Sequence, residues 1–130
     1  IMKDLIIGCI VNYNTDKIKY WINSINKSSF TGDKVMISFG TDSNTEQFIM
    51  ENGFDLYRYE KTNRHIVIDR FMAMYDFLNN SDLEYRYVIS TDIKDVVFQH
   101  NPSDWLESNM KDKKLLVSFK YKWKMMILTY

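Results

Sequence analysis

Apolar residues in the first part of the chain follow two different spacings. Residues 4–11 form an almost continuous apolar run, interrupted within its apolar part only by Gly8. Such a run is typical of a strand that is buried on both faces. The next apolar residues recur at positions i, i+3, i+4 and i+7, namely Ile18, Trp21, Ile22 and Ile25. This spacing predicts an amphipathic helix, which follows the strand after a polar break at residues 12–15.

The same alternation of strand and helix patterns continues to residue 119. The further predicted elements are a strand at Val35–Phe39, a helix from Ser43 to Asn52, a strand at Leu56–Tyr59, a helix marked by Val67, Phe71, Met74 and Leu78, a strand at Tyr85–Ser90, a short helix opened by Asn101-Pro102, and a strand at Leu115–Phe119. Strands that alternate with amphipathic helices favour an α/β fold, with a mostly parallel sheet and helices on both faces. No repeat, low-complexity segment or linker interrupts this order, so we expect a single domain.

The ends of the second predicted helix follow from capping chemistry. Ser43 is followed three residues later by Glu46, a spacing that matches a capping box and predicts that the helix begins there. Gly53 is suited to the position just after the helix, where the backbone often adopts a left-handed conformation.

The strongest chemical signal is the pair of carboxylates that follows the strand at Tyr85–Ser90. Asp92 and Asp95 are three residues apart, so in a continuing strand they would point to opposite faces. In a tight turn their Cα atoms come within about 7 Å, and both carboxylates can reach one divalent cation. The alternative is that Asp92 caps the turn through its own backbone and Asp95 is solvated.

Other polar residues follow the first two predicted strands, where ligands bind in open α/β sheets. Asn12 and Tyr13 follow the first strand, and Thr41 and Asp42 follow the second. A planar base can stack on Tyr13, and Asn or Asp can bind the base and the ribose hydroxyls. The alternative for Asn12 and Asn14 is a turn or helix-capping role, because loops are rich in such residues for that reason.

Basic residues precede or begin the third predicted helix. Arg70 is a candidate phosphate ligand, because arginine binds phosphate through a bidentate fork and helix N-termini favour anions. Arg64 and His65 are weaker candidates at the same end of the helix. The alternative is a solvated helix face, with Arg70 paired to Asp69 or Asp76.

Composition and charge exclude several classes of protein. The 130 residues carry no net charge, which argues against a nucleic-acid partner. No apolar run reaches the ~18 residues of a membrane span, and the N-terminus does not read as a signal peptide, so we expect no stable membrane insertion and a cytoplasmic location. The single cysteine, Cys9, is expected to be a buried structural thiol. The motifs GxGxxG, GxxxxGK[ST], HExxH and CxxC are all absent.

The segment Thr91-Asp92-Ile93-Lys94-Asp95-Val96-Val97-Phe98-Gln99, with Asn101-Pro102 after it, resembles the acidic motif of nucleotide-sugar glycosyltransferases of the GT-A fold. The similarity extends upstream through Arg70-Phe71 to the strand end at Val11-Asn12-Tyr13, and covers roughly residues 4–119. This resemblance implies a Rossmann-like donor-binding half, in which Asp92 and Asp95 hold Mn²⁺ or Mg²⁺ on the diphosphate of a nucleotide sugar. The implied nucleotide-binding candidates are Asn12, Tyr13, Thr41, Asp42, Arg70 and Thr91.

Two departures from that family bear on function. The usual metal motif is Asp-x-Asp, whereas Lys94 stands two residues after Asp92, so the second ligand must be Asp95. Residues 120–130 do not resemble the family's continuation, and we expect residues 1–130 to be a single, truncated nucleotide-sugar-binding domain with an atypical tail. The resemblance implies sugar transfer to an unidentified glycan or other hydroxyl acceptor. Two alternatives stay open, a non-catalytic remnant or nucleotide-binding module and an α/β domain that binds Mg²⁺ for another purpose.

Overall fold

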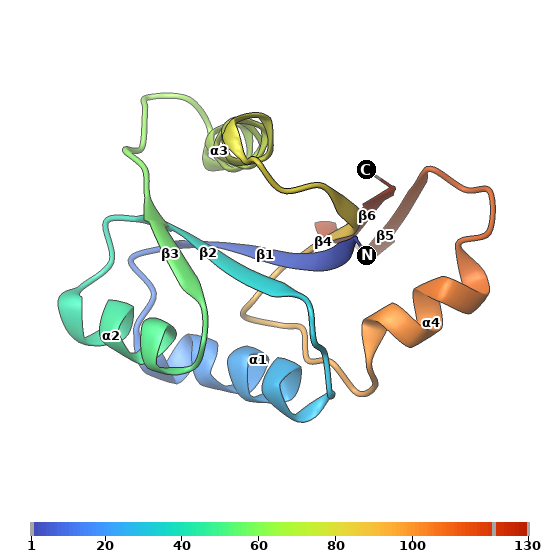
Figure 1. Cartoon of the computed structure of the whole chain (residues 1–130). Coiled ribbons are helices and arrows are strands. Elements are labelled where there is room, and N and C mark those ends of the chain that lie inside the picture. The colour runs from blue at the N-terminus through green and yellow to red at the C-terminus, as the bar shows by residue number, and fades with distance from the viewer. Residues whose placement is uncertain (1, 121, 130) are drawn as a thin grey trace.

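Every predicted strand and helix is present in the computed structural model, which describes residues 2–120 and 122–129, with side chains up to residue 115. In chain order the elements are β1 (Lys3–Val11), α1 (Thr15–Lys27), β2 (Asp33–Phe39), α2 (Ser43–Glu51), β3 (Asp55–Arg58), α3 (Ile66–Asn80), β4 (Tyr85–Thr91), α4 (Pro102–Asn109), β5 (Leu115–Lys120) and β6 (Lys122–Thr129). Helix α3 covers one face of the sheet, and α1 and α2 cover the other (Figure 1).

The strands form one six-stranded sheet in the order β3-β2-β1-β4-β6-β5. The first four of these strands are parallel, and β1 lies between β2 and β4, with Ile7 opposite both Val35 and Ser90. Strand β6 is antiparallel to β4 and to β5. The predicted fold class is therefore confirmed, and the parallel strands β1 to β4 share one edge at which all of them end.

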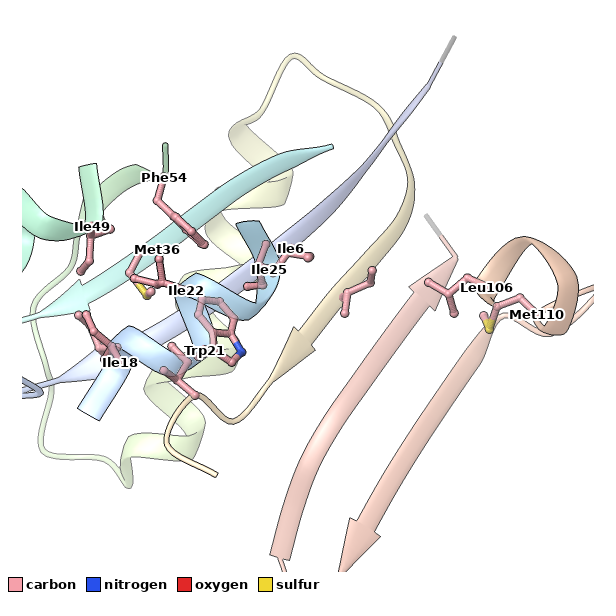
Figure 2. Packing of buried hydrophobic residues seen from close by; sticks show 13 residues of the cluster. Ile6, Ile18, Trp21, Ile22, Ile25, Met36, Ile49, Phe54, Leu106 and Met110 are labelled. Atoms are coloured by element: carbon pink, nitrogen blue, oxygen red, sulfur yellow. The ribbon is translucent and has the colours of Figure 1, made fainter. Parts of the chain in front are cut away.

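Strand β1 is apolar on both faces because each face packs against a different layer. Ile6 and Ile10 lie in a cluster with α1 and α2, whereas Leu5 and Ile7 lie in a second cluster with α3. In the first cluster, the apolar face of α1 packs toward residues of β2 and α2, and Trp21 lies at its centre, fully buried (Figure 2). Burying a side chain of this size stabilises a fold by several kcal/mol, on the order of 3–5 kcal/mol by truncation.

The second helix begins where the sequence predicts, but its cap differs. The N-cap is Asp42, whose carboxylate accepts hydrogen bonds from the Thr45 N–H at 2.8 Å and the Thr45 hydroxyl at 3.0 Å. The capping box of Ser43 and Glu46 is therefore wrong, because the Glu46 carboxylate instead forms an ion pair with Arg58 at 2.9 Å. The predicted capping box and the observed Asp42 cap would each satisfy free N–H groups of the first turn.

The third helix is confirmed, and the face that it buries overlaps only in part with the predicted one. Met74 is buried and Leu78 packs against the same cluster as predicted, whereas Val67 and Phe71 are 37% and 38% exposed. Ala73 and Phe77 complete the buried face. The helix carries apolar residues on more than one face, so periodicity alone does not identify the side that meets the sheet.

No strand was predicted after residue 119, yet residues 122–129 form β6 between β4 and β5. This segment is part of the six-stranded sheet rather than an appendage to it. Its partner β5 precedes it directly in the chain, so the two form an antiparallel pair.

Candidate functional site

A cavity of about 170 Å³ opens at the edge where the parallel strands end. It is lined by Cys9, Tyr13, Val67, Arg70, Asp92, Ile93, Lys94 and Asp95. Four of the candidates from the sequence therefore lie together, namely Tyr13, Arg70, Asp92 and Asp95. They come from three separate places in the chain, which are the segment after β1, helix α3 and the turn after β4.

The chain turns after β4, as the metal hypothesis requires. Strand β4 ends at Thr91, and the turn falls at residues 93–95, so Asp92 and Asp95 are not held on opposite faces of a continuing strand. Ile93 anchors this turn to the core, because its side chain is only 4% exposed and belongs to the cluster around Trp21. The turn is thus anchored by an apolar residue between the two carboxylates.

Gly8 of β1 makes room for that anchor. A Cβ atom at this position would lie 2.7 Å from Ile93 Cδ1 and 2.9 Å from the Trp21 ring. Such distances are shorter than carbon–carbon contact allows, so any side chain at Gly8 would push Ile93 or Trp21 away. The glycine that interrupts the first apolar run therefore positions the acidic turn.

Thr91 takes part in a chain of hydrogen bonds that joins α1 to the start of the acidic turn. Its hydroxyl accepts a hydrogen bond from Trp21 Nε1 at 2.9 Å and donates one to the Asp92 carbonyl at 3.0 Å. The residue is 1% exposed and does not line the cavity. These bonds tie the start of the acidic turn to α1, and a direct role of Thr91 in nucleotide binding stays a prediction.

Arg70 and Asp92 lie next to each other in the cavity lining. Arg70 Nη2 lies 3.4 Å from Asp92 Oδ1, and the two side chains are 19% and 16% exposed. Arg70 is therefore paired with the acidic turn. Asp69 instead binds the Thr62 backbone N–H and hydroxyl, and Asp76 accepts a hydrogen bond from Tyr59.

Asp95 and Lys94, which add one negative and one positive charge, also line the cavity, and both are exposed. Among the described residues, no three His, Cys, Asp or Glu side chains are grouped as a metal site. Two carboxylates do suit Mg²⁺, which is often held by one or two carboxylates while phosphate and water supply the other oxygens. The donor set of Asp92 and Asp95 therefore fits a cation that arrives with a diphosphate.

Tyr13 and Cys9 form the wall nearest β1. Tyr13 is half-buried, packs against the edge of the Trp21 cluster, and has the Lys17 ammonium 5.6 Å from its ring centre. Burial raises the pKa of the Cys9 thiol to about 11, although the neighbouring Arg70 acts in the opposite direction. Cys9 is therefore a protonated, buried thiol at neutral pH, as expected for a structural role.

The other candidates lie outside this cavity. Asn12 is exposed with a left-handed backbone (φ 51°), and Asn14 caps α1 by accepting from the Lys17 N–H. Among the described residues, the buried Thr41 Oγ1 has no hydrogen-bond partner. Hydrogen bonds from the Thr45 backbone and side chain hold the pKa of the Asp42 carboxyl below its usual value, which reflects its capping role. Nucleotide binding by Asn12, Thr41 and Asp42 stays a prediction.

The basic residues near the start of α3 are placed differently from one another. His65 caps the helix by accepting a hydrogen bond from the Val67 N–H, whereas Arg64 Nε lies 4.0 Å from Oδ1 of the buried Asp69.

The sequence analysis did not identify Val67, Ile93 or Cys9 as cavity residues. An apolar residue between two carboxylates is the one signal that could have identified Ile93 as the anchor of the turn.

No protein-family model and no curated protein matches the chain. S. aureus TarS residues 1–349 in complex with UDP is similar in structure, with a TM-score of 0.65, 17% identity, and coverage of 89% of this chain and 34% of that one. The glycosyltransferase GlyE of Streptococcus pneumoniae TIGR4 gives a TM-score of 0.62 at 12% identity, covering 98% of this chain and 34% of GlyE.

A candidate nucleotide-diphospho-sugar transferase from Desulfovibrio desulfuricans G20 is also similar, with a TM-score of 0.62 and 8% identity over 99% of this chain and 64% of that one. The chain thus spans a third to two thirds of the length of these three structures. Within the described part of the chain, no helix has the length and apolar character needed to cross a membrane. The chain has the α/β fold of nucleotide-diphospho-sugar transferases, a GT-A-like fold.

Proposed function

We propose that this chain binds a nucleotide-diphosphate sugar through a divalent cation held by Asp92 and Asp95, as the donor-binding part of a glycosyltransferase. The observation that carries the proposal is that Tyr13, Arg70 and both carboxylates line one cavity at the carboxyl ends of parallel strands. Ligands of open α/β sheets bind at this edge. The UDP complex of the structurally similar TarS supports a nucleotide ligand, although it shows only what TarS binds.

Each cavity residue has a chemical role in this proposal. Asp92 and Asp95 supply the protein oxygens for Mn²⁺ or Mg²⁺, and a bound cation would neutralise the charge of the departing nucleoside diphosphate. Arg70 contacts a phosphate or the ribose through its guanidinium, and Lys94 adds a second positive charge at the cavity. Tyr13 offers an aromatic surface on which the base stacks.

A nucleotide-binding module without transfer activity is the second candidate function. Transfer needs an acceptor in line with the sugar carbon and a group that takes its proton. The two carboxylates that line the cavity are both assigned to the metal, so the described cavity residues leave no third carboxylate to act as a base. This observation favours a chain that binds donor better than it transfers sugar.

A nucleotide panel tests the proposal. The full 130-residue chain is mixed with UDP, GDP, CDP or ADP, each with and without Mn²⁺, and thermal unfolding is followed. A ligand at a hundred times its Kd should stabilise the fold by about 2.7 kcal/mol, which gives a readily measured rise in Tm. We expect the rise for UDP or GDP, and only with Mn²⁺. A rise that is the same without the cation would contradict the metal site.

Incubation with the sugar nucleotide that binds separates the two candidate functions. Release of nucleoside diphosphate in the presence of acceptor alcohols would support transfer. Tight donor binding with no release would support the binding module.

A further inference from the structure

The contact between Arg70 and Asp92 is long for a charge-assisted hydrogen bond. The Nη2–Oδ1 distance is 3.4 Å, whereas strong pairs of this kind have N–O distances of about 2.7–2.9 Å. Both side chains are nevertheless more than four-fifths buried and line the same cavity. The guanidinium therefore lies beside the Asp92 carboxylate at a distance longer than that of a strong pair.

The carboxylates of α3 have partners of their own. Asp69 is 4% exposed and holds the loop before α3 through the Thr62 N–H at 2.8 Å and the Thr62 hydroxyl at 2.7 Å. Asp76 accepts hydrogen bonds from the Tyr59 hydroxyl and the Asn80 side chain. Arg70 is thus the residue of α3 that neutralises Asp92 before any cation arrives.

We propose that Arg70 occupies the place of the cation beside Asp92 and thereby makes metal binding depend on the nucleotide. A divalent ion entering the cavity alone meets a carboxylate that is already neutralised and a guanidinium that repels it. A diphosphate gives Arg70 an alternative anion, so Asp92 is released to the metal. This inference rests on the proposed function, and it assigns Arg70 the role of coupling the two ligands.

The coupling has to be reciprocal, because both ligands act on one equilibrium. The nucleotide raises the affinity for the metal by the same factor by which the metal raises the affinity for the nucleotide. Removing the guanidinium should therefore have two opposite effects. The cation alone should bind more tightly, and the nucleotide should lose both its Arg70 contact and most of its effect on the cation.

Mn²⁺ binding to the full chain, freed of metal, tests this directly. The electron paramagnetic resonance signal of free Mn²⁺ gives the Kd with and without saturating UDP. The variants are Arg70→Gln, Arg70→Lys and the matched control Arg64→Gln. Arg64 also carries one positive charge at the start of the same helix, but it faces Asp69. The control therefore removes a charge without freeing Asp92.

We expect UDP to tighten Mn²⁺ binding to the unmodified chain by about tenfold, a usual size for coupling between two ligands. Arg70→Gln should bind Mn²⁺ alone about tenfold more tightly than the unmodified chain and respond little to UDP. Arg70→Lys, which keeps the charge but not the planar fork, should fall between the two. Arg64→Gln should match the unmodified chain in both measurements.

An unchanged or weaker affinity of folded Arg70→Gln for Mn²⁺ alone would overturn the inference. If that variant does not fold, equal Mn²⁺ affinities of Arg70→Lys and the unmodified chain would overturn it instead. Failure of UDP to bind with Mn²⁺ would contradict the proposed function, whereas the order of the Mn²⁺ affinities would still decide the role of Arg70. If Mn²⁺ binds to none of the proteins, both proposals fail.

Discussion

Two arginine–aspartate pairs lie at opposite ends of the parallel strands, and they differ in the distance between the guanidinium and the carboxylate. At the edge where β1 and β4 begin, Arg86 donates to both oxygens of Asp4 at 3.0 and 2.9 Å, and the Tyr87 N–H adds a bond at 3.2 Å. At the ends where these strands finish, Arg70 Nη2 lies 3.4 Å from Asp92 Oδ1. The same two residue types thus form a short, bidentate pair at one end of the strands and a long pair at the other.

The difference separates structure from function. A buried carboxylate that is fully bonded stabilises the fold, and removing its partner is costly because the charge is left buried. A carboxylate that is only partly bonded and lines a cavity can accept a new ligand at little cost to the fold. We therefore expect changes at Asp4 to affect unfolding, and changes at Asp92 to affect ligand binding.

The largest loss of stability should come from the packing beneath the acidic turn. Trp21→Ala should lower the free energy of unfolding by about 3–5 kcal/mol, because it empties the centre of a core cluster and removes the hydrogen bond to Thr91. Trp21→Phe keeps most of the ring and should cost less. Denaturant titrations of both variants measure these losses. A loss below about 1 kcal/mol for Trp21→Ala would show that the turn does not depend on this packing.

The next largest loss of stability should come from the short, bidentate pair of Arg86 and Asp4. Burial alone would raise the pKa of the Asp4 carboxyl, but hydrogen bonds from Arg86, Ser103 and Tyr87 and the charge of Arg86 hold it below its ordinary value of 3.8. Asp4→Asn should therefore lower the free energy of unfolding at pH 7 by about 1.5–3 kcal/mol, the usual contribution of hydrogen bonds to a charged group.

The pH dependence of that loss has a definite sign. A carboxyl whose pKa is lower in the folded state contributes stability above its unfolded pKa, and loses it as the pH falls through the folded value. The difference between the unmodified chain and Asp4→Asn should thus be constant near neutral pH and shrink below about pH 3.8. Urea titrations at several pH values measure it. A difference that grows on acidification would contradict the assignment.

Tyr13 lies at the border between core and cavity, and its loss should divide between them. Stacking of a base on an aromatic ring contributes about 1–3 kcal/mol, so Tyr13→Ala should weaken UDP binding by roughly tenfold or more. Its partial packing against the Trp21 cluster predicts a smaller loss of stability. Calorimetry with UDP and a melting curve without ligand separate the two, and Tyr13→Phe is the control. A large drop in Tm with unchanged UDP affinity would place this ring in the core.

The smallest expected effect is that of Arg70 on the fold. Because its contact with Asp92 is longer than the contacts between Arg86 and Asp4, Arg70→Ala should lower the free energy of unfolding by less than the matched change at Arg86 does. The matched substitution Arg86→Ala should cost more, since it leaves the 5%-exposed Asp4 without its partner. Equal losses of unfolding free energy for the two arginine variants would remove the distinction between the short and the long pair.

The order of strands and helices could be predicted because each element carries its own periodicity. The apolar run of β1 and the stripe of α1 specify their structure locally, whereas the turn at residues 93–95 was only a condition of the metal hypothesis. Contacts between residues far apart in the sequence could not be predicted in the same way. The partner of Arg70 is 22 residues away on another element, and only the packing of α3 on the sheet selects Asp92.

Other features were missed because two solutions were chemically equivalent. Asp42 and Ser43 are both good helix caps, and the choice depends on the contact that occupies Glu46 with Arg58. Strand β6 was missed because its lysines resemble a solvated tail, although Lys122 and Lys124 flank an apolar residue in the alternation of a half-exposed strand. The role of Gly8 could not be predicted, because it depends on Ile93 and Trp21 meeting over one strand.

The central claim is that Asp92 and Asp95 hold a divalent cation for a nucleoside diphosphate. Calorimetry of UDP binding to Asp92→Asn, with and without Mn²⁺, tests this claim most directly. Asp16→Asn serves as the control, because that carboxylate is exposed on α1 and lies away from the cavity lining. We predict that Asp92→Asn abolishes the Mn²⁺ dependence of UDP binding with an unchanged melting curve, and that the control keeps it. Unchanged Mn²⁺-dependent UDP affinity in Asp92→Asn would contradict the metal site.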